Sequence, residues 1–538
     1  MRLASVGRHG AIAWILAAVA GLSLACGGGG SGRDANAAND GANDPRGLTV
    51  LAGSELKDLE PLLPDLERAT GVRLHFSYSG TLAGIDRLNA GEQFDAVWFS
   101  HAKYLVLNDA STSRVKAQEK IMLSPVVLGV KRSVAHRFGW DAKSPTWAEI
   151  AQRAKAGEFK YAMTNPTASN SGFSAVVGVA AALAGTASAL TAKDINPERL
   201  RAFFNGQALT AGSSGWLADA YVRDQDALDG IINYESILLS LDKGGQLHEP
   251  LTLVFPNEGI VTADYPLVLL SSAKRAMFDT VVAYFKSAAV QRRIMETTYR
   301  RPVNQQVPLS ADFPNKLIVE LDFPSDLDAI NGILFTYLNS ARRPAHSIFV
   351  LDVSGSMKGT RLDQLKSSLL TLAGEDSTLT GRFARFQERE RVTLISFSSS
   401  PNAPTTVSMG SAAELQAGLQ QVRQYADGLA AEGGTAIYES LAAAYRFALD
   451  AARADTSRYA SIVLMTDGEN NQGMSADDFR RYYASLPPAA KRIKVFPILF
   501  GEARQQQLAG IADLTGGRLF DGTKGGLAAV FKEIRGYQ

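Results

Sequence analysis

The sequence predicts an α/β protein built from several compact units. Short apolar runs bounded by polar residues recur along the chain, for example at 348–351 and 462–465. Such runs are typical of buried parallel strands. Segments with helical spacing of apolar residues stand between them, which implies βαβ units. A chain of 538 residues is long enough for three or four units of this kind.

The composition excludes several classes of protein. The chain has 55 Lys and Arg against 54 Asp and Glu, so no net field favours nucleic acid or an anionic membrane surface. Cys26 is the only cysteine, which excludes disulfides within the chain and a cysteine-based zinc site. The six histidines are scattered without an H-E-x-x-H pair, and this favours surface or capping roles over metal binding.

The amino terminus indicates export. Arg2 and Arg8 precede an apolar stretch over residues 11–24, which is too short for a comfortable membrane span. The next residues, Ser23-Leu24-Ala25-Cys26, resemble a bacterial lipobox. The resemblance implies that residues 1–25 are a lipoprotein signal peptide and that Cys26 is lipidated. The alternative is an ordinary cleaved signal peptide with an incidental cysteine.

Two further features follow the cysteine. Residues 26–46 are rich in Gly, Asn and Asp and offer almost nothing to bury, which predicts a disordered tether. Gly27 directly after Cys26 favours the outer membrane, where the cell has one. We therefore expect a lipid-anchored protein of the bacterial cell envelope, periplasmic or on the cell surface.

Residues 47–340 show repeated strand–helix alternation. Strands are predicted at 48–52, 72–76 and 94–99, each followed by a helical or polar segment. Together with Thr164-Asn165-Pro166 and Asn233-Tyr234-Glu235, this order resembles a periplasmic solute-binding protein with two α/β lobes. The resemblance implies a first lobe over 47–127 and part of 256–340, and a second lobe over about 128–255. The chain would cross between lobes near 125–130 and again near 255.

A cleft between two lobes is the default ligand site. Ser79-Gly80-Thr81 and Ser171-Gly172-Phe173 each open a helix after a strand, where backbone N–H groups lack intrahelical partners and attract anions. We expect a small anionic or carboxylate ligand there. The candidate ligand-binding residues are Ser54, Ser79, Gly80, Thr81, Ser100, Thr164, Ser171, Gly172 and Tyr234. The alternative is that the serines and glycines are caps and tight turns, and that Tyr234 fills the interlobe core.

Oxygen-bearing side chains mark the last third of the chain. Asp352, Ser354 and Ser356 follow the apolar run at 348–351, Thr435 precedes a helical pattern, and Asp467 follows the run at 462–465. Because open α/β sheets bind ligands at the carboxyl ends of their strands, these groups predict a site for Mg²⁺, or for Mn²⁺ or Ca²⁺. Alone, D-x-S-x-S is also a common serine-rich turn that caps a helix.

In this combination the five residues resemble the metal-ion-dependent adhesion site of von Willebrand factor type A domains. The resemblance implies a doubly wound domain over residues 341–538. It also implies that Thr435 reaches the metal directly or through water, Asp467 usually through water, and a protein partner supplies an acidic side chain. Glu469 is expected to be solvated. A helix is predicted to stop at Thr515-Gly516-Gly517.

These features favour a lipid-anchored, extracytoplasmic binding protein. It would contact the membrane through its anchor alone and would bind no nucleic acid. One alternative is a solute receptor of a membrane transport system with an accessory adhesion domain. A metal-dependent hydrolase is disfavoured, since the chain shows no G-x-S-x-G elbow, no P-loop and no general base at a suggestive spacing. We therefore expect no enzymatic activity.

Overall fold

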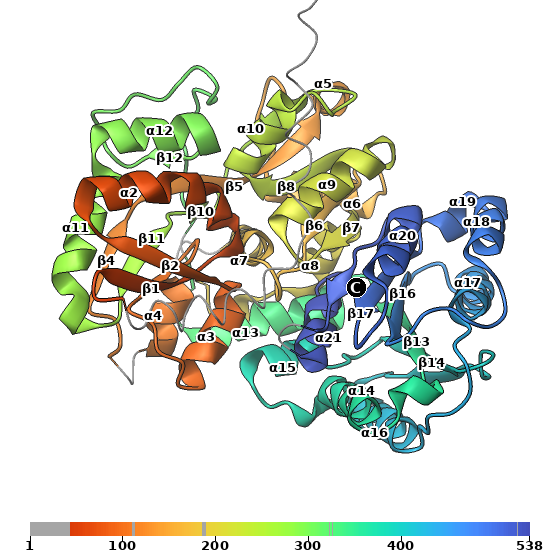
Figure 1. The fold of residues 1–538 in the computed structure, drawn as a ribbon. Coiled ribbons are helices and arrows are strands. Elements are labelled where there is room, and N and C mark those ends of the chain that lie inside the picture. Colours follow the sequence, from red (N-terminus) through yellow and green to blue (C-terminus); the bar gives the residue numbers. More distant parts are fainter. Residues whose placement is uncertain (1–43, 110–112, 186–189, 322, 325, 524–525) are drawn as a thin grey trace, which may run out of the picture.

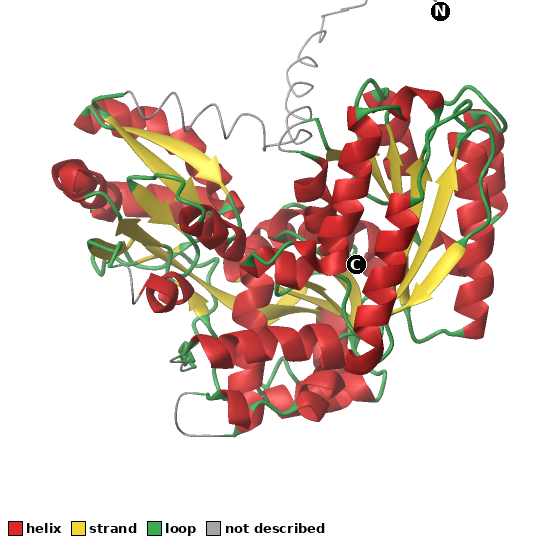
Figure 2. Ribbon diagram, turned by 90° about the horizontal axis from the view of Figure 1, so that it is seen from below, coloured by secondary structure: helices red, strands yellow, loops and turns green. Residues whose placement is uncertain are grey.

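The computed structural model describes residues 44–109, 113–185, 190–321, 323–324, 326–523 and 526–538. The predicted signal peptide, the lipidation site Cys26 and nearly all of the predicted tether lie outside these ranges. Three sheets organise the described residues (Figure 1). Helices lie beside the strands of each sheet, as Figure 2 shows. The predicted α/β class is confirmed.

The first sheet has the strand order β2-β1-β3-β11-β4. The first three strands are parallel, and β11 runs antiparallel to both of its neighbours. The strands are β1 (Gly47–Ala52), β2 (Arg73–Tyr78), β3 (Ala96–Trp98), β4 (Ala117–Lys120) and β11 (Pro266–Leu269). The helices of this lobe are the 3₁₀ helix η1 (Ser54–Leu62), α2 (Leu63–Thr70), α3 (Thr81–Asn89), α4 (Lys103–Asp109), α11 (Arg275–Lys286) and α12 (Ala288–Thr298).

The second sheet forms the other lobe, and its longest strand is β5 (Met122–Lys131). The other strands are β6 (Tyr161–Thr164), β7 (Gln207–Ala211), β8 (Gly230–Tyr234), β9 (Leu251–Val254), β10 (Thr262–Ala263) and β12 (Arg301–Pro302). The helices are α5 (Arg132–Phe138), α6 (Trp147–Lys155), α7 (Asn170–Ala184), α8 (Pro197–Phe204), α9 (Ser214–Asp224) and α10 (Glu235–Lys243).

The chain passes from the first sheet to the second at Ile121, returns at 264–265, and enters the second sheet once more at β12. The first two points differ from the predicted crossings near 125–130 and 255. The apolar run before residue 256 is β9, and it ends well before the crossing. The last strand before this crossing is β10, and its two residues are too few to show a period in the sequence.

The third sheet has the order β15-β14-β13-β16-β17-β18 and is parallel apart from the edge strand β15. Its strands are β13 (Ala345–Asp352), β14 (Arg391–Phe397), β15 (Thr405–Ser408), β16 (Tyr459–Thr466), β17 (Lys494–Leu499) and β18 (Phe520–Asp521). Its helices are α14 (Thr360–Leu370), α15 (Leu379–Ala384), α16 (Ala412–Asp427), α17 (Ile437–Ala454), α18 (Ala476–Ser485), α19 (Pro488–Lys491), α20 (Gln505–Thr515) and α21 (Leu527–Arg535). The predicted helix stop is confirmed, because α20 ends at Thr515 and Gly516 adopts φ 68°.

The two faces of this sheet enter different cores. Along β13, Ile348 and Val350 pack in a cluster with α17, whereas Phe349 and Leu351 belong to a larger cluster that also contains the cores of both lobes. Side chains alternate between faces along a strand, so one strand supplies both clusters. The third sheet is therefore joined to the solute-binding-like lobes through continuous apolar packing.

The carboxyl-terminal turn carries much of this junction. The Tyr537 ring lies 5.0 Å from the Trp216 ring, edge to face, and a Cβ atom at Gly212 would collide with it. Lys494 Nζ donates to Asp224 Oδ2 at 2.7 Å beside these rings. Gly212, Trp216 and Asp224 all belong to the second lobe.

The first lobe is joined to the third sheet by a polar contact. Asp86, on α3, accepts hydrogen bonds from the backbone N–H of Thr380 at 2.7 Å and of Leu379 at 3.2 Å. These groups open α15, so Asp86 acts as a cap supplied by another unit. The third unit therefore contacts both lobes.

A buried charged triad anchors the last residues of the chain. Glu390 accepts hydrogen bonds from Arg535 at 2.6 and 2.7 Å and forms an ion pair with Arg342. Burial acts to raise the pKa of Glu390, but the two guanidinium groups outweigh burial, and the pKa lies below its usual range. Glu390 is thus the carboxylate that both buried arginines share.

We expect Glu390→Ala to lower the free energy of unfolding by about 3–5 kcal/mol, because it leaves two buried guanidinium groups uncompensated. The stabilisation is present above about pH 4.3, the ordinary glutamate pKa, and is lost as the pH falls through the lowered pKa. Urea denaturation followed by circular dichroism checks this. Glu375→Ala, at an exposed position, is the control. Equal effects of the two substitutions would contradict the prediction.

Candidate functional site

The structure gathers the predicted metal-site residues at the carboxyl edge of the third sheet. Asp352 ends β13, and Asp467 directly follows β16, the neighbouring parallel strand. Ser356 Oγ donates to Asp467 Oδ1 at 2.7 Å, and the Ser354 and Ser356 hydroxyls are 3.0 Å apart. A Cβ built on Gly468 would lie 3.6 Å from Thr435 Oγ1 and 3.7 Å from Ser356 Oγ. All five side chains therefore border one small region.

Asp352 is held rigidly. Its Oδ1 accepts the Ser354 backbone N–H at 2.8 Å, and its Oδ2 accepts the Thr466 hydroxyl at 2.5 Å. Burial is the main cause that raises the pKa of Asp352, hydrogen bonds from Ser354 and Thr466 oppose it, and the charge of Asp467 adds to it. Thr466, which the sequence analysis did not single out, thus orients the first aspartate.

Arg361 also enters the site, from the first turn of α14. Its Nη1 lies 2.6 Å from Asp467 Oδ2, and its Nη2 lies 3.2 Å from Glu502 Oε1. The Asp467 side chain is fully buried, whereas the Arg361 side chain is 31% exposed. Asp467 is therefore neutralised by a cation that reaches it from the solvent side.

The remaining loops are positioned by backbone contacts. Thr435 N–H donates to Asn471 Oδ1 at 2.8 Å, and Gly355 N–H donates to the Gly433 carbonyl at 3.0 Å. Gly433 adopts φ 78°, a region that glycine enters without strain. Glu469 points to solvent and forms an ion pair with Arg504.

This donor set fits a hard divalent cation. Carboxylate and hydroxyl oxygens are the ligands that Mg²⁺ and Ca²⁺ prefer, and two carboxylates leave part of a dication's charge uncompensated. Among the described residues, no cluster of three His, Cys, Asp or Glu side chains suggests a different type of metal site.

Two of the predicted cleft residues, Thr164 and Ser171, belong to a buried hydroxyl network. Thr164 Oγ1 lies 2.9 Å from Ser171 Oγ, which lies 2.7 Å from Ser214 Oγ. A Cβ at Gly172 would come within 2.5 Å of the Thr164 carbonyl oxygen, so Gly172 permits this close approach. Ser214 was not predicted. The network satisfies its own members and joins the starts of α7 and α9.

Asn170 joins the two lobes. Its Oδ1 accepts the Thr81 backbone N–H at 3.0 Å, and its Nδ2 donates to Glu55 Oε1 at 3.0 Å. Gly80 lies beside the Ala168 carbonyl, where a Cβ would approach to 3.2 Å. The first helix terminus predicted to bind an anion is therefore occupied by an amide oxygen of the opposite lobe.

The other predicted cleft residues differ in exposure. Ser100 and Tyr234 are buried at the interface between the lobes, Ser79 is half-buried, and Ser54 is exposed. Sequence reasoning missed Glu55, Tyr265 and Arg300, which lie near Tyr234. Glu55 follows directly after the predicted Ser54, but no residue pattern marks Tyr265 or Arg300.

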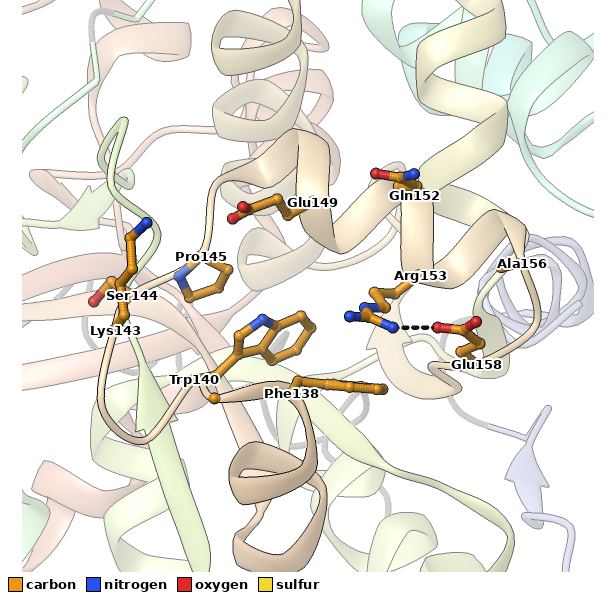
Figure 3. A pocket seen from close by; sticks show the side chains of 11 residues that line it. Phe138, Trp140, Lys143, Ser144, Pro145, Glu149, Gln152, Arg153, Ala156 and Glu158 are labelled. Atoms are coloured by element: carbon orange, nitrogen blue, oxygen red, sulfur yellow. Dashed lines mark hydrogen bonds and ion pairs between the residues drawn. The ribbon is translucent and has the colours of Figure 1, made fainter.

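A separate hollow of about 400 Å³ lies on the second lobe between α5 and α6 (Figure 3). Phe138, Trp140 and Arg153 line it, and Arg153 lies 4.6 Å above the Phe138 ring. An ion pair between Arg153 and Glu158 borders it. None of the predicted site residues lines this hollow.

Comparisons with known proteins agree with this division. A family model described as bacterial extracellular solute-binding protein matches residues 48–300, and one described as von Willebrand factor type A domain matches residues 347–469. An inter-alpha-trypsin inhibitor heavy chain H4 from Sus scrofa is 29% identical over 133 residues, which are 24% of this chain and 13% of that protein. An uncharacterized protein from Synechocystis is 34% identical over 138 residues, 24% of this chain and 27% of that protein. The chain thus spans a minor part of these relatives.

Solved structures were also found. The periplasmic binding protein AfuA from Actinobacillus pleuropneumoniae, with fructose-6-phosphate bound, is 14% identical at a TM-score of 0.43, with 55% of this chain and 99% of that chain covered. A ferric binding protein from Campylobacter jejuni is 12% identical at a TM-score of 0.39, with 53% and 95% covered.

The chain therefore combines two domain families. Its first part is a bacterial extracellular solute-binding domain, and a von Willebrand factor type A domain follows it. Both predicted resemblances are confirmed. This combination supports a binding role outside the cytoplasm.

We expect Asn170→Ala to loosen the contact between the lobes, because it leaves the Thr81 N–H and the Glu55 carboxylate without this partner. Amide hydrogen exchange at the start of α3 should become about tenfold faster or more, the scale of one lost buried hydrogen bond. Mass spectrometry of exchanged peptides checks this. Ser169→Ala is the control, since Ser169 makes only weak contacts within its own lobe. Unchanged exchange in Asn170→Ala would refute the assignment.

Proposed function

We propose that this protein is a lipid-anchored, extracytoplasmic binding protein with two binding sites. Its von Willebrand factor type A domain docks a protein partner through a divalent cation, and its interlobe cleft holds a small ligand. The observation that carries the first part is the meeting of five oxygen-bearing side chains from three distant segments at one sheet edge.

The metal ligands in this proposal are Asp352, Ser354, Ser356, Thr435 and Asp467, and the cation is Mg²⁺, with Mn²⁺ or Ca²⁺ as alternatives. When bound, the cation supplies an electrophilic centre that attracts an acidic side chain of the partner. Asp352 is fixed by Ser354 and Thr466, which reduces the reorganisation that binding requires. Arg361 balances the charge of Asp467 and would compete with the cation for this carboxylate.

The cleft ligand in this proposal has an anionic or carboxylate group. The first turn of α7 contains Ser171 and Gly172 and offers backbone N–H groups without intrahelical partners. The start of α3 is less suitable, because Asn170 already accepts the Thr81 N–H.

The anchoring part of the proposal rests on the sequence. Lipidation of Cys26 would attach the chain to the outer membrane, where one exists, or otherwise to the cell surface. Contact with the membrane would then be through the lipid alone. None of the helices in the described ranges has both the length and the apolar character of a membrane span.

A second candidate function is that of a solute receptor for a membrane transport system. The family model over residues 48–300 favours it. A bound solute together with a permease partner would support this reading over adhesion. Loss of permease contact on removal of the metal would instead point back to the docking site.

Calorimetry should detect Mg²⁺ binding to the full chain. Asp352→Asn should weaken this binding by more than about tenfold. Mutation of a residue that only contacts a metal ligand already costs about 10–100-fold in metal affinity, and Asp352 is proposed as a ligand itself. Asp363→Asn, an exposed aspartate on α14, should leave the affinity unchanged. An absence of heat with Mg²⁺ and Mn²⁺ in the wild type would rule out the metal site. A pull-down from envelope extract with and without EDTA then tests partner docking.

Arg361→Gln should tighten Mg²⁺ binding by about two- to fivefold, equivalent to roughly 0.4–1 kcal/mol, because a cation must no longer be displaced from Asp467. Arg504→Gln is the matched control, since its partner Glu469 points to solvent. Both affinities are measured by the same calorimetric titration. Weaker binding in Arg361→Gln would show that the arginine supports the site instead of competing for it.

A further inference from the structure

A polar cluster lies buried where the two lobes meet. Tyr234 ends β8, Tyr265 lies between β10 and β11, and Arg300 precedes β12. The two tyrosine rings are 6.1 Å apart, and the Arg300 guanidinium carbon lies 4.9 Å from the Tyr265 ring centre. Glu55, near the start of η1, completes the cluster and acts electrostatically on both tyrosines.

The cluster carries an unbalanced negative charge. Arg300 Nη1 lies 2.5 Å from Asp58 Oδ2, and Nη2 donates to the Glu55 backbone oxygen at 3.0 Å. Asp58 thereby matches the charge of Arg300. The Glu55 carboxylate accepts a hydrogen bond from Asn170 Nδ2, and no Lys, Arg or His of the described residues forms an ion pair with it. Burial, the largest influence, raises the pKa of Glu55.

Three polar atoms of this cluster lack partners. The hydroxyls of Tyr234 and Tyr265 and Nε of Arg300 are buried and form no hydrogen bond. Tyr234 is 1% exposed and Tyr265 is fully buried. The Tyr234 hydroxyl lies near Ser100 and the Tyr265 hydroxyl near Arg300, but without normal hydrogen-bond geometry. Native proteins pair nearly all such groups, and the two hydroxyls, which can accept hydrogen bonds, indicate that a donor belongs beside them.

The backbone around the cluster is strained. Tyr265 has φ 37° and Tyr299, next to Arg300, has φ 53°. Residues with a side chain rarely adopt these values, and such positions gather at ligand-binding sites. Tyr299 is also the left-handed residue that ends α12.

We propose that this cluster binds the ammonium group of a small organic amine or zwitterion. Glu55 is the counter-ion, and the Tyr234 and Tyr265 hydroxyls accept the other hydrogen bonds. An ammonium group has three donors and no acceptor, which suits one carboxylate and two hydroxyl oxygens. The tyrosine rings add a favourable cation–π contribution. The inference rests on the proposed ligand-binding function of the cleft, and a carboxylate on the same molecule would reach the start of α7.

Burial raises the pKa of both tyrosines well above the ordinary value. Their hydroxyls therefore stay protonated at neutral pH and act as neutral acceptors. A free anion, by contrast, would meet the Glu55 carboxylate at close range without a spare cation to offset it, since Arg300 is already paired with Asp58.

The test uses three probes with the same carbon skeleton: butylammonium, 4-aminobutyrate and butyrate. Thermal shift and calorimetry on the full chain should show binding of the first two and none of the third. Glu55→Gln should weaken that binding by about tenfold or more, the scale of a lost buried charge pair. Glu60→Gln, an exposed glutamate on the same 3₁₀ helix, should bind like the wild type.

A second readout needs no ligand. Because the folded-state pKa of Glu55 is raised, its ionised form is unfavourable in the folded protein, and stability is lost as the pH rises through that pKa. Glu55→Gln should therefore melt at a higher temperature than the wild type at about pH 8, with the difference closing at lower pH. A lower melting temperature of the variant at that pH would contradict an uncompensated Glu55.

The outcomes separate the two proposals. Butyrate binding, or amine binding that Glu55→Gln leaves unchanged, would overturn the ammonium site while keeping the cleft as a ligand site. A lack of any shift with all three probes and with inorganic phosphate, in both the wild type and Asn170→Ala, would overturn both.

Discussion

The packing of the carboxyl-terminal turn against the second lobe is the contact on which this molecule's organisation depends. Tyr537 fills the space above Gly212 and meets Trp216, while residues on one face of the third sheet join the core of the lobes. A chain with two separate binding units usually has a weak interface between them. Here apolar packing and the Lys494–Asp224 ion pair make the two halves one body.

Charge compensation sets the character of both candidate sites. At the edge of the third sheet, Arg361 reaches Asp467 from the solvent side and pairs with this carboxylate. In the cleft, Arg300 is matched by Asp58, and Glu55 is left with an amide as its polar partner. The second carboxylate of the first site is thus paired with a cationic side chain, whereas Glu55 has an amide partner.

The sequence predicted the parts of this structure that depend on local pattern. The strands that carry Asp352 and Asp467, the helix after Thr435 and the stop at Gly516 all follow from apolar period and turn chemistry. Contacts between distant segments have no such signature. Asn170 finds Thr81 only through the folding of two lobes, and Arg300 lies some 245 residues from the Glu55 oxygen that it contacts.

The positions where the chain crosses between the sheets are also difficult to predict from sequence. A two-residue strand such as β10 is defined by its pairing with β5, because two residues show no period of their own. The start of α3, which was predicted to bind an anion, is instead capped by Asn170, and the reason is related. A helix terminus is easily recognised from sequence, but the side chain that caps it from the opposite lobe is not.

The third unit touches both lobes, and this limits how far the lobes can move apart. The contact with the first lobe consists largely of hydrogen bonds to one carboxylate, Asp86, whereas the contact with the second lobe is apolar and includes Tyr537 and Trp216. If the lobes move apart, the hydrogen bonds to Asp86 should break before the apolar contact with the second lobe does. The start of α15 would then lose its cap, and the surface that carries the five oxygen donors would move together with the second lobe as a single rigid piece.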